Sequence, residues 1–212
     1  MRILCLHGMG TNSEILATQT EMIRSLLPAH YEYVFIDGEK PYDAPEQVRD
    51  FFPGPYLCYH PAPTPSAVLE AQEMVEEALE SEGPFDGVIG FSQGAALAAS
   101  IMLHRSMAFE TLPFRFAIFL CSGLPFSPLP STVRRMHPQL DQARIDIPTA
   151  DMYGKQDTEY YDQSKNLVKF CNPASCFTVE HPGGHEVPRS ARLVRDVAGA
   201  IKKVVQSLEL GH

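Results

Sequence analysis

Short apolar runs alternate with longer amphipathic stretches along most of the chain. Runs rich in β-branched and aromatic residues predict strands at 2–6, 32–36, 85–91, 114–121, 148–153 and 175–180. Stretches with apolar residues at helical spacing predict helices at 13–27, 66–82, 95–102, 159–170 and 187–208. Strands that alternate with helices in this way pack as a parallel sheet covered on both faces. We therefore expect an α/β fold with a doubly wound, mostly parallel sheet of about six strands, in a single domain over residues 1–212.

Two stretches break this alternation. Residues 37–65 hold seven prolines together with five aromatic side chains, and residues 124–147 are irregular and proline-rich at their start. Long loops inside a compact domain are usually functional or disordered, and so many aromatics argue against disorder. We predict that residues 37–65 form an ordered excursion that covers the functional site and supplies apolar wall. A purely structural flap at the domain edge is the alternative.

Charge, composition and missing motifs argue against several classes of binding partner and cofactor. The net charge of −9 argues against nucleic acid and anionic membranes, since both require basic patches. Five cysteines without a C-x-x-C pair favour reduced thiols, and no secretory signal or membrane-spanning run is present, so we expect a cytoplasmic protein. No spacing typical of metal ligands, no P-loop and no dinucleotide fingerprint occurs, so we expect no metal and no cofactor.

The most informative motif lies between the predicted strand 85–91 and the helix that follows it. Residues 90–94 read Gly-Phe-Ser-Gln-Gly, a G-x-S-x-G pattern at a strand-to-helix turn. This is the context of a nucleophile elbow, in which a serine occupies a strained turn at the start of a helix. The pattern alone is common, but its position between a buried strand and an Ala-rich helix favours Ser92 as a nucleophile.

Two further polar residues follow later strands. Asp157 comes after the fifth predicted strand and His185 after the sixth, which gives the chain order nucleophile, acid, base. Each has a simpler explanation by itself, Asp157 as a turn residue and His185 as a surface histidine. Together with Ser92 they predict a Ser-His-Asp triad. The rival groups are three carboxylates and one histidine: Asp151, Glu159, Asp162 and His181.

Acyl transfer through a serine also requires donors for an oxyanion. The backbone N–H of Gln93 follows from the elbow. We expect the second donor in the loop after the first strand, from the backbone of Met9, where Gly8 and Gly10 let the chain bend.

Four segments together carry a resemblance. LCLHGMGTN, VIGFSQGAALAA, MYGKQDTEYY and HPGGHEVP occur in the order found in the fungal serine hydrolase family, and the chain resembles that family over nearly its full length. The segment DGEKPYDAPEQVRDFFPGPYLCYHPAPTP is similar to the branch that contains the lovastatin-pathway thioesterase. The resemblance implies an α/β-hydrolase fold, the triad Ser92, Asp157 and His185, and Met9 and Gln93 as oxyanion donors.

The resemblance also implies a substrate. In that branch a trans-acting thioesterase releases a polyketide from the acyl carrier domain of a polyketide synthase. Such a chain needs an apolar channel, so we expect Phe52 and Tyr56 to line a groove beside Ser92, with residues 124–129, Leu124 first, opposite. The alternatives are a carboxylesterase for small or lipid-like esters and, in another class, a non-catalytic binding partner that retains the fold.

Overall fold

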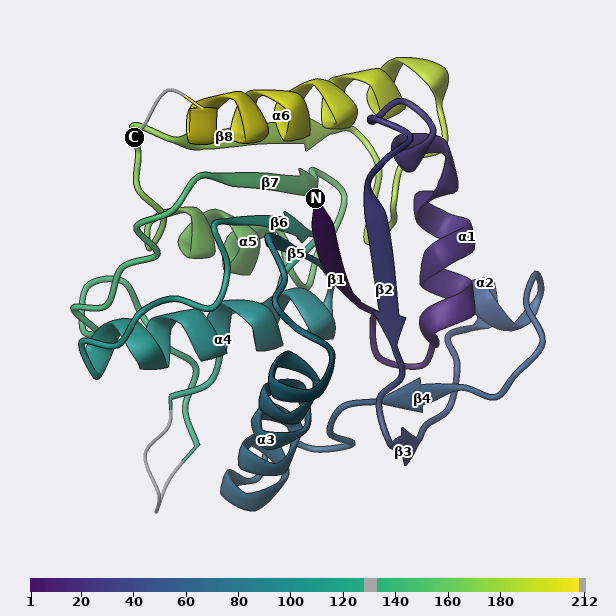
Figure 1. Ribbon diagram of the computed structural model, residues 1–212. Helices are drawn as coiled ribbons and strands as arrows, with labels where there is room; N and C mark the ends of the chain where they lie inside the picture. Colours follow the sequence, from purple (N-terminus) through teal and green to yellow (C-terminus); the bar gives the residue numbers. More distant parts are fainter. Residues whose placement is uncertain (128–132, 210–212) are drawn as a thin grey trace.

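A six-stranded parallel sheet forms the centre of the molecule (Figure 1). The computed structural model describes residues 1–127 and 133–209. The strands of the sheet are β1 (Arg2–Leu6), β2 (Glu32–Ile36), β5 (Gly87–Phe91), β6 (Phe116–Leu120), β7 (Thr149–Gly154) and β8 (Cys176–His181). They lie in the order β2-β1-β5-β6-β7-β8, and each neighbouring pair is parallel. The predicted fold class is confirmed.

Helices cover both faces of this sheet (Figure 1). They are α1 (Ser13–Arg24), α3 (Pro65–Glu82), α4 (Gln93–Met107), α5 (Tyr161–Val168) and α6 (Ala191–Glu209). The apolar residues of α1 and α6 share one buried cluster, and those of α3, α4 and α5 share the other. Strand β1 shows how the sequence produces this layering. Its side chains alternate, so that Ile3 and Cys5 join the first cluster while Leu4 and Leu6 join the second.

The strand order reverses between β1 and β5. The chain leaves β1 toward β2 at one edge, whereas it leaves β5 toward β6 in the opposite direction. Loops that diverge from neighbouring parallel strands leave an opening at the carboxyl ends of those strands, where α/β proteins bind ligands. Here the two loops are residues 7–12 after β1 and the turn at Ser92 after β5.

The proline-rich excursion is ordered and packs on the loop after β1. It contains α2 (Glu46–Arg49) and the short antiparallel strands β3 (Lys40–Pro41) and β4 (Leu57–Cys58). The N–H of Gly10 donates to the carbonyl of Leu57 at 2.9 Å, and the N–H of Leu57 donates to the carbonyl of Thr11 at 2.8 Å. The excursion is therefore joined by backbone hydrogen bonds to the loop that follows β1.

Several boundaries differ from the predicted ones by a few residues. Helix α1 ends at Arg24 and not at residue 27, because the N–H groups of Leu26 and Leu27 bond carbonyls three positions back and tighten the last turn. Helix α6 begins at Ala191 and not at 187, since Pro188 lies in the loop that leads into it. Within the second irregular segment, residues 128 and 129 of the predicted wall lie outside the described residues.

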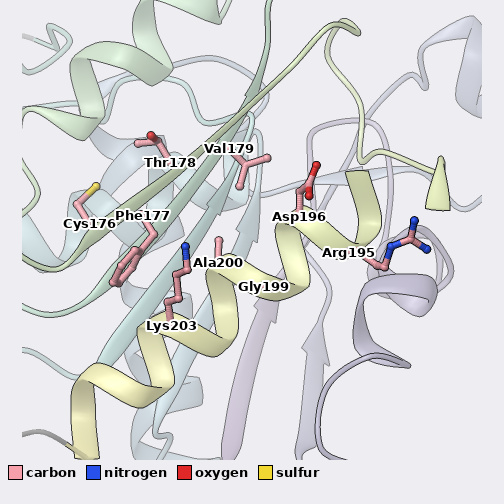
Figure 2. A pocket seen from close by; sticks show the side chains of 9 residues that line it. All are labelled: Cys176, Phe177, Thr178, Val179, Arg195, Asp196, Gly199, Ala200 and Lys203. Atoms are coloured by element: carbon pink, nitrogen blue, oxygen red, sulfur yellow. The ribbon is translucent and has the colours of Figure 1, made fainter. Parts of the chain in front are cut away.

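Strand β8 forms one edge of the sheet, and α6 packs against it. A groove of about 470 Å³ runs between β8 and α6 (Figure 2), and it is lined by residues of these two elements alone. In the described part of the chain, no helix is both long enough and apolar enough to span a membrane.

Candidate active site

Ser92 occupies a strained turn between β5 and α4. Its backbone has φ 52° and ψ −113°, a conformation with positive φ that side-chain-bearing residues rarely adopt. Hydrogen bonds hold the turn on both sides: the N–H of Ser92 donates to Leu120 O at 2.9 Å, and the N–H of Gly94 donates to His7 O at 3.1 Å. A Cβ on Gly94 would lie 2.3 Å from the carbonyl oxygen of Leu6, so only glycine lets α4 begin this close to β1.

The side chains of Ser92, His185 and Asp157 form one hydrogen-bonded chain. The Nε2 atom of His185 lies 2.8 Å from Ser92 Oγ, and its Nδ1 atom lies 2.6 Å from Asp157 Oδ2. A carboxylate only accepts, so Nδ1 carries the proton and Nε2 is left to accept from the serine hydroxyl. The geometry brings together the three residues that the sequence singled out.

Asp157 is fixed in this chain by its own loop. It is buried at 4% exposure, and its Oδ1 atom accepts the N–H of Tyr160 at 2.9 Å and that of Glu159 at 3.3 Å. Oδ2 is thereby directed toward His185. Such bonds hold the carboxylate in place without a neighbouring cation.

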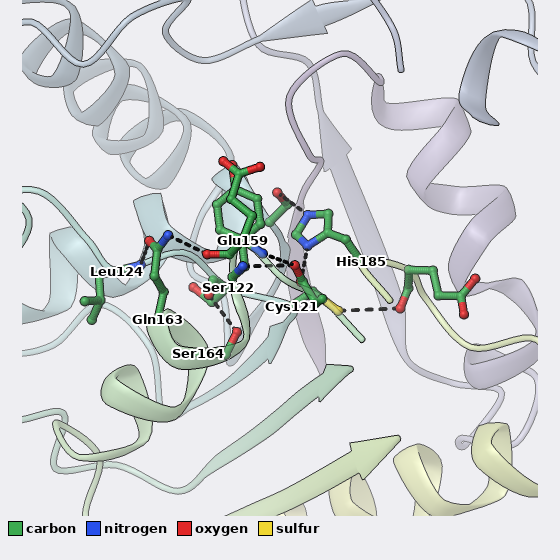
Figure 3. A network of polar contacts seen from close by, with 11 residues as sticks. Cys121, Ser122, Leu124, Glu159, Gln163, Ser164 and His185 are labelled. Carbon is green, nitrogen blue, oxygen red and sulfur yellow. Dashed lines mark hydrogen bonds and ion pairs between the residues drawn. The ribbon is translucent and has the colours of Figure 1, made fainter. Parts of the chain in front are cut away.

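Helix α5 ties this loop to the segment after β6 (Figure 3). The Gln163 side chain accepts the N–H of Leu124 at 3.1 Å and donates to Glu159 O at 3.0 Å. The Ser164 hydroxyl donates to Ser122 O at 2.7 Å. These bonds couple the position of the Asp157 loop to that of the chain leaving β6.

The rival acids and the rival base have other environments. Asp151 is buried within β7, Asp162 is on the exposed side of α5, and Glu159 meets Asp157 through its backbone. His181 is 1% exposed, and its Nδ1 accepts the N–H of Gly183 at 3.2 Å. Burial lowers the pKa of His181.

The imidazole of His185 has neighbours that the sequence did not indicate. The ring centroid of Tyr160 lies 4.6 Å from that of His185, and the centroid of Phe91 lies 5.3 Å away. Cys121, at φ 49°, donates its thiol hydrogen to the carbonyl of Glu186 at 3.5 Å (Figure 3). Tyr160 follows Asp157 by three residues and Glu186 follows His185, but only the fold reveals that they share one site.

The loop after β1 lies directly against the elbow. A Cβ on Gly8 would come within 3.3 Å of Ser92 Cβ, and Gly10 has φ 72°. Within the described ranges, the N–H groups of Met9 and Gln93 donate to no protein acceptor. Both predicted oxyanion donors are thus backbone groups free to donate.

A buried histidine fixes the shape of this loop. His7 is fully buried, its Nε2 accepts the N–H of Gly38 at 2.8 Å, and its Nδ1 lies 2.8 Å from Gly8 O. Nδ1 therefore carries the proton and donates to Gly8. Burial lowers the pKa of His7, which keeps the ring neutral as both contacts require.

Gln93 connects the elbow to the proline-rich excursion. Its Oε1 accepts the N–H of Tyr59 at 2.9 Å, and its Nε2 donates to His60 O at 2.8 Å. The hydroxyl of Tyr59 accepts the N–H of His7 at 3.0 Å and donates to Ile36 O at 3.2 Å. The sequence pointed to the backbone of Gln93 but gave no sign of the role of its side chain.

The three predicted substrate contacts differ in exposure. Phe52 and Tyr56 are half-buried and share a bond from the Tyr56 hydroxyl to Phe52 O at 2.7 Å. Neighbouring Phe51 is 70% exposed and lies under the guanidinium of Arg189, which follows His185 by four residues. Leu124 is 7% exposed and packs in the core cluster on the α4 face.

Among the residues that the structure describes, two groups of side chains have the composition of metal ligands. Cys121, Asp157 and His185 have ligand atoms within 4.8 Å of one another. In this group Asp157 and His185 already bond each other through Nδ1 of the imidazole, so a cation held between them would replace that hydrogen bond. The second group, Asp151, Cys171 and Cys176, shares no residue with the first.

Solved structures of low sequence identity share this fold. SOBER1 of Arabidopsis thaliana superposes with a TM-score of 0.61 at 20% identity, covering 97% of this chain and 99% of that one. A carboxylesterase from Mesorhizobium loti gives a TM-score of 0.61 at 18% identity, covering 100% of this chain and 88% of that one. The fold is that of the α/β-hydrolases.

Sequence comparisons narrow the class further. The family model of the FSH1 serine hydrolases matches residues 1–197. The esterase FPY3 of Fusarium mangiferae is 38% identical over 220 residues that cover 100% of both chains. The esterase alnB of Emericella nidulans is 28% identical and covers 100% of this chain and 99% of its own. This chain belongs to the FSH1 family of serine hydrolases, as the resemblance implied.

Proposed function

We propose that Ser92 is the nucleophile of a serine hydrolase, with His185 as its general base and Asp157 as the group that orients His185. The observation that carries this proposal is the pair of contacts on the two nitrogens of His185, 2.8 Å to Ser92 Oγ and 2.6 Å to Asp157 Oδ2. A serine hydroxyl is a weak nucleophile at neutral pH and needs such a base.

The reaction proceeds in two halves. Ser92 Oγ attacks the acyl carbon while His185 Nε2 takes the hydroxyl proton, and Asp157 stabilises the imidazolium that forms. His185 returns the proton to the leaving group, which departs and leaves an acyl-serine. Water, deprotonated by the same nitrogen, then releases the carboxylic acid.

The tetrahedral intermediates place negative charge on the former carbonyl oxygen. The N–H groups of Met9 and Gln93 are the donors for that oxygen, and both belong to segments held by buried hydrogen bonds. The start of α4 adds the positive end of a helix dipole at the same point. Preorganised donors of this kind stabilise the transition state more than the ground state.

The substrate class follows from chemistry and from the resemblance. A thioester suits the site because its thiolate departs readily and needs little protonation by His185. The excursion resembles that of polyketide-releasing thioesterases, so the acyl group is a polyketide chain presented by a carrier domain. Phe52, Tyr56 and Leu124 are the proposed apolar contacts of that chain, and a cytoplasmic synthase is the source of the carrier.

A carboxylesterase acting on small or lipid-like esters is the second candidate. Two relatives along the whole chain are named esterases, which favours oxygen esters as substrates. Membership of a serine hydrolase family favours either enzyme over a non-catalytic binding partner.

One comparison of substrates separates these functions. Hydrolysis of an acyl group on a carrier domain is measured beside hydrolysis of the oxygen ester of the same acyl group, with Ser92→Ala as the control. A kcat/KM that is at least tenfold higher for the carrier-bound thioester supports the thioesterase. A preference for the oxygen ester supports the carboxylesterase. If the wild type hydrolyses neither substrate, both proposed functions are wrong.

A further inference from the structure

A second cluster of reactive side chains lies between β7, β8 and the end of α5. It consists of Asp151, Cys171 and Cys176, whose carboxylate oxygen and two sulfurs lie within 4.8 Å of one another. Asp151 is 3% exposed in a strand otherwise packed in the core, and its Oδ2 accepts the Thr149 hydroxyl at 3.1 Å and the Cys176 thiol at 3.4 Å. The proposed hydrolysis uses none of these groups.

The two thiols differ in their access to solvent. All five cysteines fall within the described ranges and are free; four are buried, and Cys176 alone is partly exposed. Cys176 is the first residue of β8, the edge strand of the sheet. In Figure 2 its sulfur points away from α6, which agrees with its packing in the cluster on the opposite face. A solute therefore meets Cys176 before any other thiol.

The neighbours of Cys176 favour its reactive form. The neighbouring Cys171 side chain lowers the pKa of Cys176 below the ordinary range of a thiol, while the pKa of Cys171 is raised. Burial raises the pKa of Asp151, which disfavours the charged carboxylate that would repel a thiolate. Cys176 is thus the nucleophile of the pair, and the Cys171 thiol keeps its proton until the disulfide forms.

We propose that Cys176 and Cys171 form an oxidisable dithiol, in which the sulfur of the partly exposed Cys176 attacks a hydroperoxide and the buried sulfur of Cys171 then closes an intramolecular disulfide. The proposal rests on the closeness of the two sulfurs, on the exposure of Cys176 alone, and on the buried polar group beside them.

The two steps balance with hydrogen peroxide as the oxidant. The Cys176 sulfur attacks one peroxide oxygen, the O–O bond breaks, and the departing hydroxide takes a proton to leave as water. Cys176 is then a sulfenic acid. The Cys171 sulfur attacks the Cys176 sulfur, the S–O bond breaks, and a second water leaves with the Cys171 proton. Two thiols supply two electrons, and one peroxide accepts them.

Mass spectrometry tests this directly on the full chain. Trypsin cleaves after Lys169 and after Arg189, so both cysteines fall in one peptide, residues 170–189. After brief exposure of the folded protein to hydrogen peroxide and alkylation without reductant, the proposal predicts that this peptide loses the mass of two hydrogens and gains no alkyl group. Reduction should restore both alkylation sites.

Variants assign the roles of the two thiols. Cys171→Ser should stop at the sulfenic acid, which dimedone traps on Cys176, and Cys176→Ser should leave Cys171 unmodified. Cys58→Ser is the matched control, because Cys58 is also buried and free but lies in β4, and it should form the disulfide like the wild type.

Three outcomes would overturn the proposal. One is peroxide consumption that leaves residues 170–189 fully alkylatable, and another is dimedone adducts on Cys176 in the wild type with no disulfide. The third is one equivalent of Zn²⁺ that stays bound through dialysis in the wild type and is lost from Cys176→Ser, which would assign the cluster to a metal.

Discussion

The hydroxyl of Tyr59 accepts the backbone N–H of His7 at 3.0 Å, and this bond joins the proline-rich excursion to the loop that carries Met9. Both residues are buried, so neither group has water as an alternative partner. The excursion therefore acts on the loop after β1 through a buried hydrogen bond. It fixes the conformation of the backbone that faces Ser92.

Removing that hydroxyl should weaken the loop. In Tyr59→Phe the His7 N–H keeps no acceptor, and a buried unpaired donor costs about 1–3 kcal/mol of unfolding free energy. We expect a loss of this size in urea denaturation and a lower kcat with little change in KM. Tyr42→Phe is the control, since Tyr42 is an exposed tyrosine of the same segment. Equal effects of the two substitutions would contradict the role given to Tyr59.

Asp157→Asn tests the orientation of His185. An amide in place of the carboxylate donates to Nδ1 and favours the wrong imidazole tautomer, which lowers kcat by roughly 10⁴-fold in serine proteases built on the same triad. We expect kcat to fall by roughly 10³-fold to 10⁴-fold, close to the loss in those proteases, with unchanged thermal stability. Asp162→Asn, on the exposed side of α5, should keep wild-type rates. If Asp157→Asn retains near-wild-type turnover, another carboxylate orients the base.

The excursion should also make kcat/KM depend on the length of the acyl chain of the substrate. Phe52→Ala removes a half-buried ring of this segment, and remote contacts add binding energy only when the substrate reaches them. We expect kcat/KM to fall more for a long-chain thioester than for a short p-nitrophenyl ester. Phe51→Ala, a change at the 70% exposed neighbour, should affect both substrates little. Equal losses on long and short substrates would show that Phe52 supports the fold instead.

Asp151 makes stability depend on pH. Burial raises the pKa of Asp151, so the folded chain keeps a proton that the unfolded chain loses above about pH 4. The folded state then binds more protons, and stability falls as pH rises toward the folded pKa, by up to about 1.4 kcal/mol per pH unit. Asp151→Asn cannot titrate, so its stability relative to the wild type should improve with pH. A difference that stays constant between about pH 5 and pH 8 would refute this.

The sequence predicted the strands and helices of the sheet because the patterns that indicate them are local. Apolar runs such as 85–91 are short and bounded, and the alternation of strands with helices leaves few topologies. Ser92, Asp157 and His185 could be named because each follows the end of a strand, and parallel strands bring their carboxyl ends to one edge.

Other features depend on contacts between distant parts of the chain. Nothing near Gln93 in the sequence shows that its amide binds the backbone at Tyr59, 34 residues away. Met22, an apolar residue of the predicted helix 13–27, is 47% exposed. The sequence offered Asp151 only as a rival acid, and the fold alone shows that two thiols lie near its carboxyl group.

The most direct test of the proposed function is to locate the nucleophile through the covalent adduct that it forms with a serine-directed inhibitor. The protein is treated with a fluorophosphonate, which reacts with activated serines, and the adduct is mapped by peptide mass spectrometry in the wild type and in Ser92→Ala. We predict one adduct per chain, on Ser92, no adduct in Ser92→Ala, and a loss of kcat in that variant of roughly 10⁶-fold, as for removal of a triad serine elsewhere. An adduct on any other residue, or labelling that persists in Ser92→Ala, would contradict the account.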